Sequence, residues 1–177
     1  FNFNVLVPLL ASQTRDVGAG TFGLLSAAFG LGALAGALAT ARRRHGFELF
    51  AWVVMPEHVH LLLRPAHGQV WATIASAVKN PTAKAGLAHL RGERSPVLDA
   101  VQYDDAARFW QPGGGFDRTV RDDAEFCREV CYIHRNPVER GLVATPEEWG
   151  ATSVRWWIGR REEELECDPP PLRGWEA

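Results

Sequence analysis

Two histidines one residue apart, His58 and His60, stand in the string MPEHVHLLL, whose composition is typical of a β-strand. Because side chains alternate faces along a strand, both imidazoles are expected to project from the same face. Two neutral imidazoles placed together in this way can hold a divalent cation. The same spacing also occurs on ordinary half-exposed strands, so the pair alone leaves two interpretations open, a metal site and a plain strand.

A second segment that could do chemistry is a predicted helix, which begins near Asp122 and is expected to stop at Pro137. Apolar residues at helical spacing predict its buried stripe, made up of Phe126, Val130 and Ile133. At about 100° per residue, Tyr132 points almost opposite to that stripe, and Asn136 lies one turn further on the same side. Packing does not explain a tyrosine on the polar face of a helix, which favours a chemical role.

Three separated strings carry a resemblance to a known family. They are AWVVMPEHVHLLL, RFWQPGGGFDR and CYIHRNPVERGLV, in that order, and ATPEEWGATSVRWW follows them. Together they resemble the REP-associated tyrosine transposases, a branch of the HUH single-strand DNA transposases, over residues 44–171. Three motifs in order are a more specific signal than the histidine pair alone.

The resemblance implies a role for each of four residues. His58 and His60 match the family's metal ligands, Tyr132 matches its nucleophile, and Asn136 matches the polar residue that completes the metal site. A positioned tyrosine hydroxyl could attack a phosphodiester and leave a 5′-phosphotyrosine and a free 3′-hydroxyl. Mixed nitrogen and oxygen ligands suit Mg²⁺ or Mn²⁺. The implied partner is single-stranded or hairpin DNA, with no small-molecule cofactor and with the protein acting as a monomer or a dimer.

The composition limits the ways in which the chain could bind DNA. Its 177 residues suffice for one domain with a core, and a net charge of −2 provides no overall basic signature. DNA binding must therefore depend on local patches, although a solvated charged face is the competing interpretation of each patch. Aromatic rings beside arginines can stack on bases, although at least half of the tryptophans are expected in the core. The expected DNA contacts are Lys79, Lys84, Arg91, Arg94, Arg118, Arg155 and Trp156.

Three cysteines without a CxxC pair favour a reduced, cytoplasmic protein over a disulfide scaffold. Cys127 and Cys131 share a flank of the predicted helix with His134. That flank could be a zinc cluster, but small cysteines also pack well in a core, which is the preferred interpretation.

The N-terminal segment has a different character. Residues 17–41 carry no charge and are followed by three arginines, Arg42, Arg43 and Arg44. The segment resembles a fragment of a major facilitator superfamily transporter, and it is long enough to span a membrane. We expect a helix over residues 20–44 that packs on the sheet and does not span a membrane. Its fit should be loose, with exposed apolar surface around Leu24, Leu31, Leu34 and Leu38.

The expected fold class is α+β, a ferredoxin-like antiparallel sheet with packed helices of the HUH type. Strands are predicted over 47–55 and 58–64, and a helix over 74–90 that breaks near Asn80 and Pro81. The domains would be a transporter-like segment over 1–43, a transposase-like catalytic domain over 44–171 and a tail over 172–177. The first segment is expected to form a strand and an apolar helix in place of the family's first strand and helix.

Three function classes follow, in order of preference. The first is an active single-strand DNA transposase or endonuclease. The second is a DNA-binding relic that cuts poorly. The third is a membrane-tethered or misfolded fusion product without a role.

Overall fold

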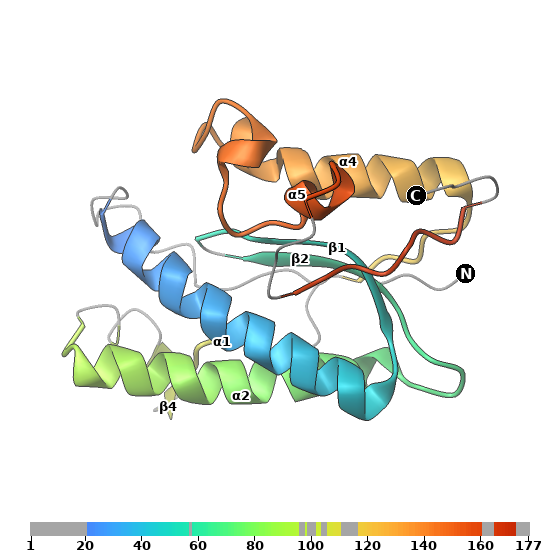
Figure 1. Cartoon of the computed structure of the whole chain (residues 1–177). Coiled ribbons are helices and arrows are strands. Elements are labelled where there is room, and N and C mark those ends of the chain that lie inside the picture. The colour runs from blue at the N-terminus through green and yellow to red at the C-terminus, as the bar shows by residue number, and fades with distance from the viewer. Residues whose placement is uncertain are drawn as a thin grey trace.

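The computed structural model describes residues 21–56, 58–95, 98, 102–103, 106–110, 117–160 and 165–172 of the chain. Its α+β architecture has a central β-hairpin with helices on both sides (Figure 1). Helix α4 runs along one side of the hairpin, and α1 and α2 lie on the other. The elements in chain order are α1 (Thr21–His45), β1 (Glu48–Val54), β2 (Val59–Arg64), α2 (Trp71–Gly92), β3 (Gln102–Tyr103), β4 (Ala106–Ala107), α4 (Asp123–Glu139), η2 (Pro146–Glu148) and α5 (Val154–Trp157).

The hairpin confirms both predicted strands to within one residue at each end. β1 and β2 pair antiparallel, and the Met55 N–H donates to the His58 carbonyl at 2.7 Å to close the turn. The register shifts by one residue between Leu49 and Ala51, which is the mark of a β-bulge. Nearly every residue of both strands is buried, because helices cover both faces of the hairpin.

The outer edge of β1 is paired with the C-terminal part of the chain. The Ser153 N–H donates to the Trp52 carbonyl, and the Val54 N–H donates to the Ala151 carbonyl, both at 2.9 Å. Val53 and Thr152 form an antiparallel bridge between these two bonds. The returning chain thus takes the place of a third strand, so this edge of the hairpin does not face solvent.

Two indole groups satisfy carbonyls that this short pairing does not reach. Trp149 Nε1 donates to the Val54 carbonyl, and Trp157 Nε1 donates to the Phe50 carbonyl, both at 2.9 Å. Buried carbonyls left without donors are costly, so these indoles stabilise the strand as well as filling the core.

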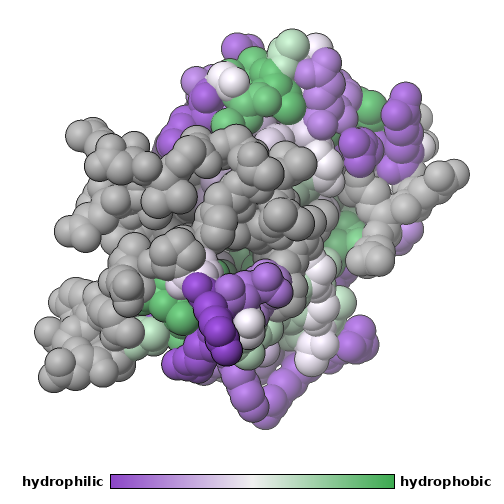
Figure 2. Space-filling model, turned by 90° about the vertical axis from the view of Figure 1, so that its left-hand side faces the viewer, coloured by the Kyte–Doolittle hydropathy of each residue, from purple (hydrophilic) through white to green (hydrophobic). Residues whose placement is uncertain are grey.

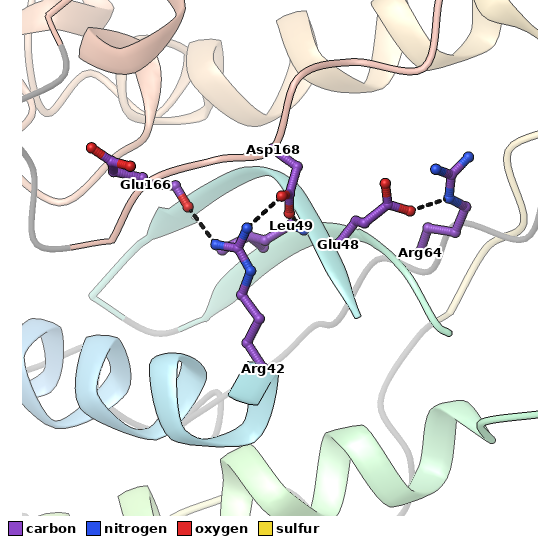
Figure 3. A network of polar contacts seen from close by, with 6 residues as sticks. All are labelled: Arg42, Glu48, Leu49, Arg64, Glu166 and Asp168. Atoms are coloured by element: carbon purple, nitrogen blue, oxygen red, sulfur yellow. Dashed lines mark hydrogen bonds and ion pairs between the residues drawn. The ribbon is translucent and has the colours of Figure 1, made fainter. Parts of the chain in front are cut away.

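A polar network joins α1, β1 and the C-terminal segment (Figure 3). Arg42 forms an ion pair with Asp168 and donates to the Glu166 carbonyl. Asp168 in turn accepts from the Leu49 N–H and donates its own N–H to the Leu49 carbonyl. These bonds hold the end of α1 and the chain near residue 168 against the start of β1.

The α1 helix confirms the expected helix over residues 20–44 to within one residue. The expectation that Leu34 and Leu38 would be exposed is wrong, because both are buried in the main core, while Gly32 and Gly36 face solvent. Three buried alanines of α1, Ala35, Ala37 and Ala41, join the same core, and their small side chains allow a close approach to α2. The side chains of Leu24 and Leu31 lie outside the described residues. Within the described ranges, no helix is both long and apolar enough for a membrane crossing.

Both predicted helix breaks at proline are wrong. The α2 helix continues through Pro81, and α4 continues through Pro137 for two further residues. Pro81 lies on the exposed side of α2, where its ring does not disturb packing. Pro81 has no backbone N–H to donate within the helix. The neighbouring Thr82 hydroxyl lies within hydrogen-bond distance of the Val78 and Lys79 carbonyls and so gives this turn an additional donor. Pro137 stands in the last turn of α4, where few intrahelical bonds remain to be lost.

The start of the RFWQPGGGFDR string docks on α2 through Phe109 and Trp110. Trp110 Nε1 donates to the Thr82 hydroxyl at 2.9 Å. Phe109 lies against Gly86, where a Cβ atom would stand 2.3 Å from Phe109 Cε2. Gly86 therefore serves close packing here, and the Trp110 indole is engaged inside the protein.

This contact predicts opposite effects for two glycine-to-alanine changes. Gly86→Ala should lower the free energy of unfolding by about 1–2 kcal/mol, because the Phe109 ring must shift. Gly36→Ala is the matched control in a helix, since nothing lies within 4 Å of its added Cβ. It should raise stability by about 0.5–1 kcal/mol through helix propensity. Urea unfolding of both variants measures the difference, and equal signs would contradict the Phe109 contact.

Candidate functional site

The two histidines of the hairpin lie side by side on the face that α4 covers. His60 is in β2 and His58 directly precedes that strand, so they share one face as predicted. Their ring centroids are 4.7 Å apart. Both rings are buried, with 8% of His58 and 3% of His60 exposed, so the protein around them controls how they are oriented.

Helix α4 is held over this face by its cap and its apolar stripe. The Asp122 carboxylate accepts from the Glu125 N–H at 2.7 Å, as the predicted helix start requires. Phe126 packs edge-on against Phe50 of β1, with ring centroids 5.4 Å apart. The predicted stripe, Phe126, Val130 and Ile133, is buried. The polar side of α4 is thereby directed toward the end of the hairpin that carries the histidines.

The structure brings all four predicted site residues together. The ring of Tyr132 contacts the ring of His60 edge-on, with centroids 5.4 Å apart. Asn136, one turn further along α4, places its Oδ1 atom 3.4 Å from His58 Nε2. Tyr132 is 47% exposed, whereas Asn136 is 6% exposed. A tyrosine that solvent can reach thus has its ring against one of three buried nitrogen- and oxygen-bearing side chains.

The spacing of these groups fits a small divalent ion. Two adjacent ligands of an octahedral ion at about 2.1 Å lie about 3 Å apart, and His58 Nε2 and Asn136 Oδ1 are close to that separation at 3.4 Å. Among the residues the structure describes, no group of three or more His, Cys, Asp or Glu side chains could hold a metal ion. An ion at this site would therefore need the Asn136 amide oxygen together with the two imidazoles.

Two carboxylates on the polar side of α4 are paired with one arginine, a feature that the sequence analysis missed. Arg118 forms ion pairs with Glu125 and Glu129, and both glutamates are buried. The pKa of the Glu125 carboxyl is lowered, mainly because the carboxylate accepts a hydrogen bond from the Arg121 N–H. The Arg118 guanidinium lowers this pKa further, and burial opposes both effects. The i, i+4 spacing of the two glutamates was the available sequence signal. The Arg118 side chain is half-exposed, and its partner Glu129 lies about one helical turn before Tyr132 on α4.

The other expected DNA contacts do not gather at this site. Lys84, Arg91 and Arg94 are exposed on or directly after α2, across the hairpin from α4 (Figure 1). Lys79 lies on the same helix, and burial lowers the pKa of its ammonium group. Figure 2 shows hydrophilic residues in separate upper and lower groups on one face of the molecule. The basic residues of α2 thus form a surface separate from the site on α4.

The C-terminal members of the expected contact set are engaged within the protein. Arg155 donates to the Glu147 carbonyl at 3.2 Å. Trp156 is only 6% exposed and packs in the main core beside Trp157. A DNA base could not stack on the Trp156 ring in this arrangement, so burial argues against the contact expected there.

The cysteine flank of α4 differs from the expectation. Cys127 and Cys131 are exposed, so the prediction that they pack in the core is wrong. His134 from the same flank is buried, and its Nε2 lies 2.9 Å from the Ser153 hydroxyl. Burial lowers the pKa of His134 to about 4, with a smaller opposing effect of the Glu147 charge. The imidazole is therefore neutral at pH 7.

Comparisons with known proteins point to the family that the motifs resemble. The chain is 27% identical over 118 residues to the REP-associated tyrosine transposase of Escherichia coli, a match that spans 64% of this chain and 58% of that protein. It is 26% identical over 113 residues to a counterpart from Haemophilus influenzae, spanning 60% of this chain and again 58% of the relative. The chain is a homologue of the REP-associated tyrosine transposases. Its match spans less than two thirds of the length of these relatives.

A solved structure of a REP-associated tyrosine transposase bound to a REP hairpin has the same fold as this homologue. The TM-score is 0.60 with 21% sequence identity, and the match covers 99% of this chain and 89% of the other. No protein-family model matches the sequence. The comparisons lend no support to the transporter resemblance of residues 1–43, and the same structural match extends over nearly the whole chain.

The buried His134 predicts a pH dependence of stability. Its folded-state pKa of about 4 is below the ordinary value of 6.5, so between these values the unfolded chain binds a proton that the folded chain does not. The free energy of unfolding should therefore fall by about 1.4 kcal/mol per pH unit as the pH decreases through this window, and be unaffected by His134 above it. Urea unfolding at several pH values, compared with His134→Gln, isolates the effect. Equal pH slopes for the two proteins would contradict it.

Proposed function

We propose that the chain is a metal-dependent enzyme that cleaves and rejoins single-stranded DNA with Tyr132 as its nucleophile. The observation that carries the proposal is the placement of an accessible Tyr132 ring against His60 while Asn136 lies beside His58. Homology to REP-associated tyrosine transposases supports the same reaction class. The substrate would be a hairpin or repeat DNA, as the solved hairpin-bound relative suggests.

In the proposed reaction the Tyr132 oxygen attacks the scissile phosphorus. The bond from phosphorus to the 3′ oxygen breaks, and the products are a 5′-phosphotyrosine and a free 3′-hydroxyl. The proton lost from the tyrosine is balanced by the proton gained at the leaving oxygen. A Mg²⁺ or Mn²⁺ ion held by His58, His60 and Asn136 would polarise the phosphate. Strand transfer is the reverse attack, by a 3′-hydroxyl on the phosphotyrosine.

The neighbouring charges favour a phosphate at Tyr132. Glu125 and Glu129 lie on the same side of α4 as the tyrosine, and unpaired carboxylates there would repel DNA. Arg118 pairs with both, and nearly half of its side chain remains exposed. We propose that Arg118 contacts the DNA backbone next to the scissile phosphate, whereas Lys84, Arg91 and Arg94 would hold a more distant part of the hairpin.

We also propose that the described hairpin belongs to a ferredoxin-like antiparallel sheet. Helices lie on both sides of the hairpin, and the match to the solved relative covers 99% of this chain and 89% of that relative. The boundary expected at residue 43 falls within α1, whose buried residues share one core with the hairpin. Residues 1–43 would thus supply the first part of the catalytic fold.

The first test removes the attacking oxygen. Tyr132→Phe should abolish the covalent protein–DNA adduct with labelled hairpin DNA and Mn²⁺, and leave DNA affinity nearly unchanged, because only one hydroxyl is lost. Denaturing gels measure the adduct, and fluorescence anisotropy measures affinity. Tyr103→Phe is the control, because Tyr103 is the only other tyrosine of the chain. An adduct formed by the Tyr132→Phe protein would refute the assignment.

The second test concerns the metal. His60→Ala should reduce adduct formation at least about 100-fold and weaken Mn²⁺ binding measured by calorimetry, because one ligand is lost. His67→Ala is the matched control, since His67 is exposed and follows the same hairpin outside the site. Equal Mn²⁺ binding by the His60→Ala and His67→Ala proteins would exclude His60 as a ligand.

A further inference from the structure

Ser153 joins the C-terminal segment, strand β1 and helix α4 at one buried point. Its hydroxyl accepts from the Trp52 N–H at 2.8 Å and lies 2.9 Å from His134 Nε2. The same hydroxyl is 3.2 Å from the Trp52 carbonyl. Ser153 is 0% exposed and His134 is 6% exposed, so water does not compete for these bonds.

The position of His134 on α4 gives this junction a consequence for the site. At about 100° per residue, His134 points roughly 160° away from both Tyr132 and Asn136. One flank of α4 therefore contacts β2, because the Tyr132 ring packs against the His60 ring. The opposite flank is linked to the outer edge of β1, because His134 bonds to Ser153, which in turn bonds to Trp52 of β1. Trp157 packs beside the His134 ring, with centroids 6.2 Å apart. A rotation of α4 about its axis would break the His134 contact and move Tyr132 at the same time.

We propose that Ser153 and His134 are positioning residues, whose hydrogen bond sets the rotation of α4 and thereby holds Tyr132 against His60 and Asn136 beside His58. This inference deepens the proposed function and rests on it for its catalytic consequence. It also gives a role to the ATSVRWW string, since Ser153 stands in that string and does not touch the site itself. The competing explanation is that Ser153 only satisfies the backbone of β1.

The experiment compares two buried hydroxyl residues that are adjacent in the chain. Ser153→Ala removes the bond to His134. Thr152→Val is the matched control, because Thr152 is also 0% exposed and also reaches the Trp52 carbonyl, at 3.4 Å, but makes no bond to α4. Both variants are measured at a temperature where circular dichroism shows them folded. Readouts are the nuclear Overhauser effect between the Tyr132 and His60 rings, the adduct rate at saturating hairpin DNA, and DNA affinity.

Ser153→Ala should weaken the Tyr132–His60 ring signal and slow adduct formation about tenfold or more, with DNA affinity unchanged, because misplacing a reacting group by about 1 Å has effects of this size. Thr152→Val should retain the ring signal and the rate. Equal behaviour of the two variants would overturn the positioning role. If Ser153→Ala does not fold, two variants of His134 test the same bond. His134→Leu removes the bond and should lose the Tyr132–His60 ring signal. His134→Gln keeps an acceptor for the Ser153 hydroxyl and should retain that signal.

The two proposals fail separately. A wild-type protein that forms no adduct would refute the proposed function, while the ring signal in the variants would still decide whether Ser153 and His134 set the rotation of α4. Normal adduct formation by wild type together with an unchanged ring signal in Ser153→Ala would refute only the positioning role.

Discussion

The outer edge of β1 is the constraint on which the rest of the structure depends. β1 is buried on both faces, so each backbone group on its free edge needs a partner from the protein. Those partners come from residues 149–168 and include backbone groups, two indoles, the Ser153 hydroxyl and the Asp168 carboxylate. The C-terminal segment consequently belongs to the core, and through Arg42 and Asp168 it also holds the end of α1.

The site is built on elements that this edge keeps in place. The histidines come from one end of the hairpin, and α4 crosses the same hairpin on its apolar stripe. A polar helix face above a buried histidine pair would be unfavourable without compensation, because carboxylates and imidazoles lose hydration there. The Arg118 bridge to Glu125 and Glu129 and the contact of Asn136 with His58 supply that compensation. Among His58, His60, Tyr132 and Asn136, Tyr132 alone remains substantially open to a large ligand.

The sequence and structural comparisons agree on the family to which the chain is related. The sequence matches relate the chain to REP-associated tyrosine transposases over about 60% of its length, and the fold match covers nearly all of it. The first helix, which has an unusual Gly- and Ala-rich composition, packs in the common core. Small side chains allow that helix to approach α2 closely, which explains why an apolar segment of this kind can serve in the interior of an α+β fold.

The sequence by itself determined the local features of this protein. Strand alternation predicted that His58 and His60 share a face, and helical periodicity placed Tyr132 and Asn136 together opposite the apolar stripe, because both are properties of a single element. The tertiary structure alone decided how separate elements meet. It buried Trp156 and Leu38, exposed Cys127 and Cys131, paired Arg118 with two glutamates, and carried two helices through prolines. Each of these outcomes depends on which surface a neighbouring element covers, and local periodicity does not contain that information.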